Sequence, residues 1–171
     1  MELVVCAFVG SEKAEQVKSA LQKYDEELDA IKLGNIAVLK KDEKGKFSFH
    51  ETNEDAAVKQ GATIGLLSGA ILSVLFGPLA MAAGAAAGAA AGSLPFVSMV
   101  DLGFPDSALK KLGNSLDSGS SALVLLAELD EVALVIEFLE QQGGTLIQHR
   151  LPTDVIKTLK MVEREREAVA D

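Results

Sequence analysis

The stretch "SSALVLLAELDEVALVIEFLEQQGGTLIQHRL", residues 120–151, carries the pattern that decides the fold. Its first part, "SSALVLLAELD", is a short apolar run of the kind found in buried strands. The part "DEVALVIEFLEQQGG" predicts a helix that Gly143 and Gly144 bring to an end. The part "TLIQHRL" predicts another strand. The sequence here therefore predicts a strand, a helix and a strand in succession.

The N-terminal part of the chain shows the same alternation of patterns. The segment "LVVCAFV" (3–9) predicts a buried strand. Residues 11–31 follow with apolar side chains at helical spacing, which predicts an amphipathic helix with Ser11 as its N-cap. The segment "GNIAVLKKDEKGKFSFHET" (34–52) predicts two strands joined by a turn at Glu43 to Gly45.

The complete order of predicted elements indicates an α+β fold. Pro105 marks the start of a further helix, and a charged amphipathic helix follows Pro152. The order is then βαββ, an uncharged block, and αβαβα. This order predicts a ferredoxin-like sandwich, in which helices cover one face of a mainly antiparallel sheet. Residues 1–58 and 101–171 are the two halves of this domain, and residues 59–100 form a hairpin inserted between them.

The uncharged block has an internal pattern of its own. Small residues recur at every fourth position on both sides of a Gly-Pro dipeptide, which is a strong helix breaker. Glycine inside a helix costs about 1 kcal/mol relative to alanine, so a repeated stripe indicates close packing against another helix. The pattern predicts a glycine-zipper helical hairpin. Its packing residues are Gly61, Gly65, Gly69, Ser73, Gly77, Gly84, Gly88 and Gly92, and its turn is Gly77 and Pro78.

The length of each arm leaves the surroundings of this hairpin open. Residues 60–76 span roughly 25 Å as a helix and residues 79–94 roughly 24 Å, against a bilayer core of about 30 Å. The first arm is rich in strongly apolar side chains, whereas the second is mostly alanine and glycine and needs the first as a partner. We expect a membrane hairpin. A soluble hairpin buried between subunits and a wholly intramolecular core are the alternatives.

The overall charge excludes one class of partner. The chain has 16 basic and 25 acidic residues and a net charge of −9, so it repels a phosphate backbone and nucleic acid is not an expected partner. The single Cys6 cannot form an intramolecular disulfide. The start, "MELVVCAFVG", lacks the basic region of a secretory signal, and we expect both termini in the cytoplasm.

The chain also resembles a known group of sequences. The segments "GNIAVLKKDEKGKFSFHE", "DLGFPDSALKKLGNSLDSGSSALVLLAE" and "GGTLIQHRL", together with the glycine-rich block, are similar to a bacterial and archaeal family of uncharacterised small proteins. That family is catalogued as a domain of unknown function and is often labelled "predicted membrane protein". The resemblance covers nearly the whole chain and implies the same layout and membrane label, but it carries no activity.

Few residues of the chain suggest chemistry. His50 and His149 lie at the ends of predicted strands, and a shared metal site would need neighbouring strands and more ligands, so we interpret both as solvent-facing. We interpret Cys6 as a small buried hydrophobic residue. The serines in "LDSGSSALVLL" precede a strand rather than a helix N-terminus, which is the wrong geometry for phosphate binding. No catalytic, cofactor-binding or metal-binding residue is expected.

These observations favour a membrane-associated, non-enzymatic protein that assembles with copies of itself through the hairpin. Its expected partners are other copies of the chain and the lipid bilayer. Two other functions stay open. One is a soluble, cytoplasmic assembly, such as a filament, ring or cage, with the hairpins buried between subunits. The other is a regulatory domain that senses a small ligand on its sheet.

Overall fold

A computed structural model of the chain describes residues 1–28, 35–44, 47–51, 105–157 and 161. The predicted hairpin at 59–100 lies outside the described residues, as do the boundaries at residues 58 and 100. Those boundaries stay predictions.

The described elements follow the order that the sequence predicts. Strand, helix and strand patterns at both ends of the chain are confirmed, and residues 153–157 after Pro152 are helical. The elements are β1 (Glu2–Val9), α1 (Lys13–Leu28), β2 (Asn35–Lys41), β3 (Phe47–Glu51), α5 (Asp106–Ser115), β4 (Ser120–Ala127), α6 (Val132–Gln141) and β5 (Thr145–Arg150).

The five strands form one antiparallel sheet in the order β3-β2-β4-β1-β5. Strand β4 pairs with β1 on one side and with β2 on the other. This strand comes after the uncharged block, and it therefore lies between two strands that come before the block. Since each neighbouring pair is antiparallel, β1 runs parallel to β2 and β4 runs parallel to β5. The fold is of the mixed α+β class, as predicted.

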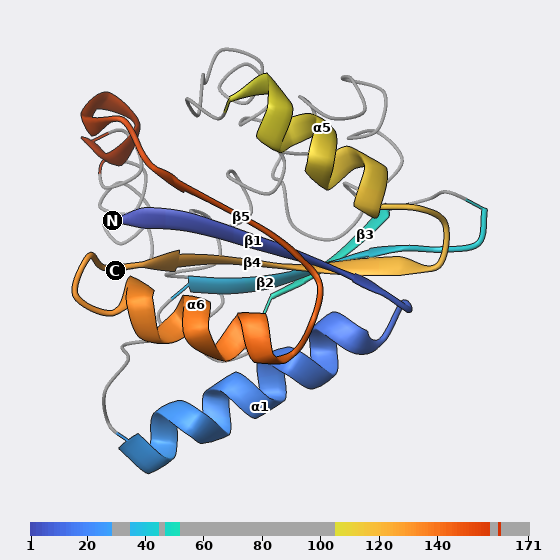
Figure 1. The fold of residues 1–171 in the computed structure, drawn as a ribbon, viewed down its shortest axis with the longest axis horizontal. Coiled ribbons are helices and arrows are strands. Elements are labelled where there is room, and N and C mark those ends of the chain that lie inside the picture. The colour runs from blue at the N-terminus through green and yellow to red at the C-terminus, as the bar shows by residue number, and fades with distance from the viewer. Residues whose placement is uncertain (29–34, 45–46, 52–104, 158–160, 162–171) are drawn as a thin grey trace, which may run out of the picture.

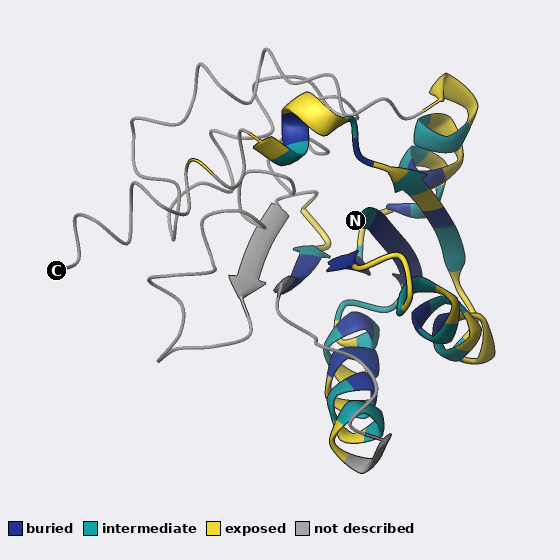
Figure 2. Cartoon of the chain, turned by 90° about the vertical axis from the view of Figure 1, so that its left-hand side faces the viewer, coloured by how far each residue is buried: buried dark blue, intermediate teal, exposed yellow. Residues whose placement is uncertain are grey.

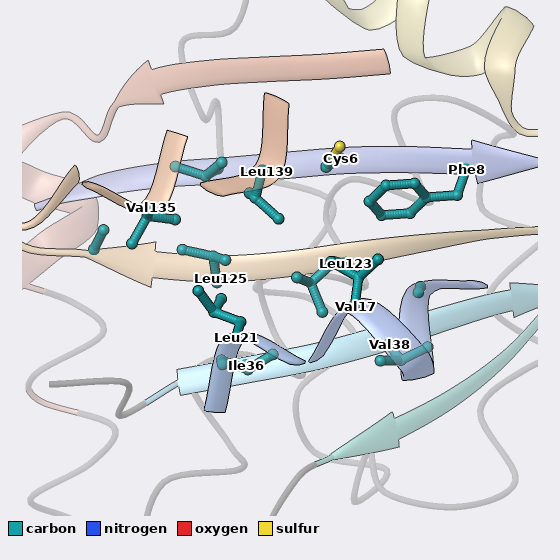
Figure 3. Packing of buried hydrophobic residues seen from close by; sticks show 13 residues of the cluster. Cys6, Phe8, Val17, Leu21, Ile36, Val38, Leu123, Leu125, Val135 and Leu139 are labelled. Carbon is teal, nitrogen blue, oxygen red and sulfur yellow. The ribbon is translucent and has the colours of Figure 1, made fainter. Parts of the chain in front are cut away.

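Helices α1 and α6 lie side by side on one face of the sheet, which we call the first face (Figure 1). Each helix connects two parallel strands and packs its apolar stripe on the sheet. Figure 3 shows Val17 and Leu21 of α1 and Val135 and Leu139 of α6 over the side chains of β1, β2 and β4. Complete burial of one such side chain stabilises a fold by about 1.5–3 kcal/mol.

The opposite, second face of the sheet is also apolar and buried. Leu3, Val5 and Ala7 alternate with the first-face residues of β1 and are at most 2% exposed. In Figure 2 the strand that begins at the N-terminus is coloured as buried almost throughout. Burial on both faces explains why β1 and β4 appear in the sequence as continuous apolar runs.

Helix α5 packs on this second face (Figure 1), against β1 and β5. The expectation that helices cover one face is therefore wrong for α5, although α1 and α6 do share one face. The physical reason is the second apolar face, which needs a cover of its own. Leu112 of α5 and Leu116, which follows the helix, supply part of it and are 0% and 1% exposed.

The junction between α6 and β5 depends on a glycine. Gly144 has φ +147°, and a Cβ built on it would lie 2.7 Å from the carbonyl oxygen of Ala7 and 2.9 Å from the Phe8 ring. Only a residue without a side chain allows the turn to approach β1 this closely. The predicted end of the helix at Gly143 and Gly144 is confirmed, and β5 starts directly after it.

Candidate functional site

Cys6 lies within the first-face core and is 1% exposed. Its neighbours in the cluster are apolar, and Figure 3 shows Cys6 on the same strand as Phe8. Burial raises the pKa of the Cys6 thiol to about 12, because the charged thiolate would lose its hydration. The prediction of a buried, hydrophobic cysteine is confirmed, and at neutral pH its thiol is protonated and a poor nucleophile.

The two histidines lie at opposite edges of the sheet. His50 belongs to β3, which pairs with β2, and His149 belongs to β5, which pairs with β1. Four strand spacings separate the two edges, or about 19 Å at 4.8 Å each, so the two residues cannot share a metal ion. Within the described part of the chain, no group of three or more histidine, cysteine or acidic residues could hold a metal. His149 is half-buried rather than fully solvent-facing.

Ser121 is the buried polar residue with the clearest structural role. It is 0% exposed and lies at the start of β4. Its Oγ donates a hydrogen bond of 2.6 Å to the carbonyl oxygen of Gly10, and accepts one of 3.0 Å from the N–H of Ala14. The hydroxyl thus satisfies two backbone groups at the start of α1, from a position 107 residues further along the chain than Ala14.

This arrangement corrects the predicted cap of α1. A cap at Ser11 would accept a hydrogen bond from the N–H of Lys13 or Ala14. In the structure, Lys13 donates to the carbonyl oxygen of Gly10 and Ala14 donates to Ser121. A tertiary contact has replaced the local one, which sequence spacing cannot reveal. The available signal was a serine inside an otherwise apolar strand, since a buried hydroxyl needs a partner.

The described residues nearest to the uncharged block form what we call the mount. It consists of β2, β3 and α5, because the chain leaves β3 at Glu51 and returns through Pro105 to α5. Two polar contacts hold the C-terminal end of α5 in place. Ser115 Oγ lies 2.8 Å from Thr145 Oγ1 of β5, and Lys41 Nζ of β2 donates a 2.8 Å hydrogen bond to the carbonyl oxygen of Leu116.

Lys41 suits this position electrostatically. The last carbonyl groups of a helix have no partner within the helix and carry a partial negative charge, which an ammonium group stabilises. Its side chain lies on the second face, since β2 places Ile36 and Val38 in the first-face cluster. The Lys41 carbonyl oxygen also accepts a 2.9 Å hydrogen bond from Gly119 N–H. The mount therefore links the hairpin before the block to the helix after it.

The predicted packing residues of the block lie outside the described residues. These are Gly61, Gly65, Gly69, Ser73, Gly77, Gly84, Gly88 and Gly92, with the turn at Gly77 and Pro78. Among the helices of the described ranges, none combines the length and the apolar character that crossing a bilayer requires. The glycine-zipper prediction stays a prediction.

The fold thus defines an α+β domain that is completed by strands from both sides of a long central segment. The chain belongs to the family described as "Protein of unknown function (DUF1269)", whose sequence model matches residues 58–162. No curated protein and no solved structure matches the chain. The family that the sequence resembles is therefore confirmed as one of unknown function.

The matched range and the sheet do not have the same limits. Residues 58–162 contain the block, α5, β4, α6 and β5, whereas β1, β2 and β3 come before the match begins. The matched range therefore contributes two strands, β4 and β5, to the five-stranded sheet. One of them, β4, lies between β1 and β2, which are outside the match. In this protein, residues before the matched range complete the sheet of the domain.

Proposed function

We propose that this chain is a membrane-anchored, non-enzymatic protein that forms homo-oligomers through a glycine-zipper hairpin carried by a ferredoxin-like domain. The observation that carries the proposal is the position of β4, which is hydrogen-bonded to β1 and to β2. Strands from both sides of the uncharged block therefore belong to one sheet.

The strand order supports the ferredoxin-like part of this proposal. Without the edge strand β3, the order is β2-β4-β1-β5, and it contains two units in which a helix joins two parallel strands. The two parallel strands of each unit are separated by one strand of the other unit: β4 lies between β1 and β2, and β1 lies between β4 and β5. This interleaving of two βαβ units is the arrangement of a split βαβ sandwich. Strand β3 and helix α5 are additions next to the block.

The shared sheet also limits how the block can meet a bilayer. A segment that crossed the membrane an odd number of times would leave β2 and β4 on opposite sides. The hydrogen-bonded register between Asn35–Lys40 and Ser121–Leu126 does not permit that separation. A membrane insertion therefore needs an even number of crossings. Two short arms around Gly77 and Pro78 fit this requirement.

The residues with potential chemistry support a structural role. The Cys6 thiol is protonated within the core, and Ser121 is engaged by two backbone groups of the α1 N-terminus. His50 and His149 belong to strands at opposite edges of the sheet. Cys6 and Ser121 therefore have structural explanations, and we assign the function to the glycine stripes of the block, through helix packing.

Fractionation of cells that express the full chain tests the membrane anchor. We expect the protein in the membrane pellet, and in the supernatant only after detergent is added. The variant Leu67→Arg places a charge in the first arm, which costs about 2.5–3.5 kcal/mol near a helix centre, so it should move the protein out of the membrane. The matched control is Leu129→Arg, at a position that is 47% exposed in the folded domain.

A second result of the same experiment would contradict the proposal. If the wild-type chain stays in the detergent-free supernatant at high mass, the hairpins are buried between subunits of a soluble assembly. Microscopy of the pellet distinguishes membranes from filaments large enough to sediment.

The zipper itself is tested by Gly65→Leu and Gly69→Leu. Each adds a bulky side chain where two backbones should approach closely, so each should reduce the oligomer size in detergent. Ala70→Leu, next to the stripe, is the control. An unchanged oligomer size in both glycine variants would disprove the zipper.

A further inference from the structure

One edge of the sheet has the features of an interface. Among the described strands, β5 is the last in the order and pairs only with β1. It pairs over six consecutive positions without a bulge, from Thr145 to Arg150. Proline and charged side chains, lysine above all, are features with which proteins protect an edge strand. The sequence of β5, TLIQHR, contains no proline, lysine or acidic residue, and Arg150 stands only at its last position. Such an edge presents backbone groups that can pair with another strand.

The side chains on the first face of β5 can be assigned from the register. Leu146 pairs with Cys6 and packs against the first-face cluster, and Arg150 pairs with Glu2. Because side chains alternate along a strand, Leu146, Gln148 and Arg150 all lie on this face. Gln148 and Arg150 are exposed. The only charged side chain on this face of β5 is therefore a positive one, at its C-terminal end.

Helix α6 provides the complementary charge. Its Phe138 contacts Tyr24 of α1, with ring centroids 5.2 Å apart, while Val135 and Leu139 face the core. At 100° per residue, Ile136 and Glu140 then lie on the flank turned away from α1, toward the outer side of β5. Ile136 is half-buried and Glu140 is exposed. Glu140 lies in the last turn of α6, where the helix dipole adds negative potential.

We propose that two copies of this chain pair through their β5 edges, antiparallel and around a two-fold axis, to form one continuous sheet. For the first faces of both sheets to stay on the same side, facing residues must belong to the same face of β5. Two registers meet this condition, one with the axis beside Ile147 and one with the axis beside Gln148. In both registers, Arg150 lies opposite the start of the partner's β5, which directly follows the partner's α6.

This geometry brings opposite charges together. Arg150 of each copy approaches the C-terminal end of the other copy's α6, which carries Glu140, and the axis repeats the pair at the other end of the interface. The two half-buried Ile136 side chains lie near the axis, between the charge pairs. The surface is therefore self-complementary, and this favours a second copy over an unrelated partner. The interface uses no residue of the glycine stripe, so the two proposals are tested independently.

Cysteine cross-linking of the full chain tests this interface. The native Cys6 is buried and protonated, so an introduced cysteine is the reactive one. We expect Gln148→Cys to give a covalent dimer with a mild oxidant or a short bifunctional maleimide, since both registers bring the two positions close together. The matched control is Gln16→Cys, an exposed position on α1, which should stay monomeric on a denaturing gel.

Charge substitutions test the proposed contact. In the Gln148→Cys background, Arg150→Glu should weaken dimerisation about tenfold, because it creates two repulsive pairs per dimer. Adding Glu140→Arg should restore cross-linking. Glu12→Arg, an exchange at an exposed residue near the start of α1, should not restore it. An unreactive Cys6 verifies that each variant is folded.

Several results would overturn the interface. One is the absence of a covalent dimer from Gln148→Cys, and another is equal dimer formation by Gln16→Cys. The interface would also be wrong if the adduct had a mass other than twice that of the chain, or if the charge exchange did not restore cross-linking. Gly65→Leu separates this inference from the proposed function. If that variant loses its large oligomers but still cross-links at position 148, both interfaces exist. If the zipper variants disrupt assembly while position 148 never cross-links, only the β5 interface is wrong.

Discussion

The two faces of the sheet are both buried, but different interactions cover them. The first face is covered by α1 and α6, which contribute branched side chains and each connect two parallel strands. The second face has α5, which connects the uncharged block to β4 and is held by the polar contacts of Lys41 and Ser115 as well as by Leu112. We therefore expect the first face to contribute most to the stability of the domain, and the contacts of the second face to hold α5, the helix that follows the block, in place.

The largest expected effect is at the centre of the first face. Leu21 is 0% exposed, so Leu21→Ala removes buried methyl groups and leaves a cavity. We expect the free energy of unfolding to fall by about 2–5 kcal/mol, measured by urea denaturation of the full chain. Leu112→Ala on the second face is the counterpart, also at a 0% exposed residue. Leu112→Ala should lower the free energy of unfolding by less than Leu21→Ala does, because α5 packs near one edge of the sheet and can move into the cavity. Equal losses would contradict the comparison.

A smaller loss is expected from the buried hydroxyl that joins β4 to α1. Ser121→Ala leaves the Gly10 carbonyl and the Ala14 N–H without this partner in a buried position. The Gly10 carbonyl still accepts from the N–H of Lys13, so the Ala14 N–H is the group left unsatisfied. One such group costs about 1–3 kcal/mol, and we expect a loss in this range. Ser120→Ala is the matched control, because its Oγ donates a hydrogen bond to the nearby Asp117 carbonyl in a turn. A loss at Ser120 as large as at Ser121 would mean that the tertiary cap adds no stability.

Ser121 and α5 also show what the sequence can and cannot predict. The order of strands and helices follows from apolar periodicity, because each element buries a face of its own. The cap by Ser121 was missed because it joins residues that are 107 positions apart and leaves no local spacing. The position of α5 was missed for a related reason. A strand buried on both faces looks like any continuous apolar run, so β1 and β4 do not reveal how many helix layers cover them.

The candidate site divides in the same way. The glycine stripe is a strong sequence pattern because its spacing has one physical use, the close approach of helices. By contrast, "LKKD" at residues 39–42 gives no indication that one lysine caps a helix after the block. Strand alternation places Lys40 and Lys41 on opposite faces, but the partner of each depends on the tertiary fold.

The first face also contains the group that should make stability depend on alkaline pH. The pKa of Cys6 is raised from 9.0 to about 12 by burial, so the unfolded chain ionises first. The contribution of the protonated thiol to the free energy of unfolding is fully present below pH 9 and is lost as the pH rises toward 12. Between pH 8 and pH 10 we expect the wild type to lose about 1.4 kcal/mol more than Cys6→Ala. Denaturation curves of both proteins across this range provide the measurement, and parallel pH dependences would show that the thiol is not buried.

The smallest effect distinguishes the faces through two adjacent lysines. Lys40 forms a 2.8 Å ion pair with Glu12, a residue whose side chain is 66% exposed, near the start of α1. Lys41 donates to the carbonyl oxygen of Leu116 at the end of α5, in a partly buried position. We expect Lys41→Met to cost about 1 kcal/mol of stability, since it removes a charged donor from a helix end. Lys40→Met should cost less, because exposed ion pairs contribute little.

Hydrogen exchange of the backbone amides shows which helix or strand each variant destabilises. Faster exchange in α5 for Lys41→Met, with α1 unchanged, is the result required if Lys41 fastens the mount. Faster exchange throughout the sheet would instead make Lys41 part of the general stability of the domain, and the proposed division between the two faces would be wrong.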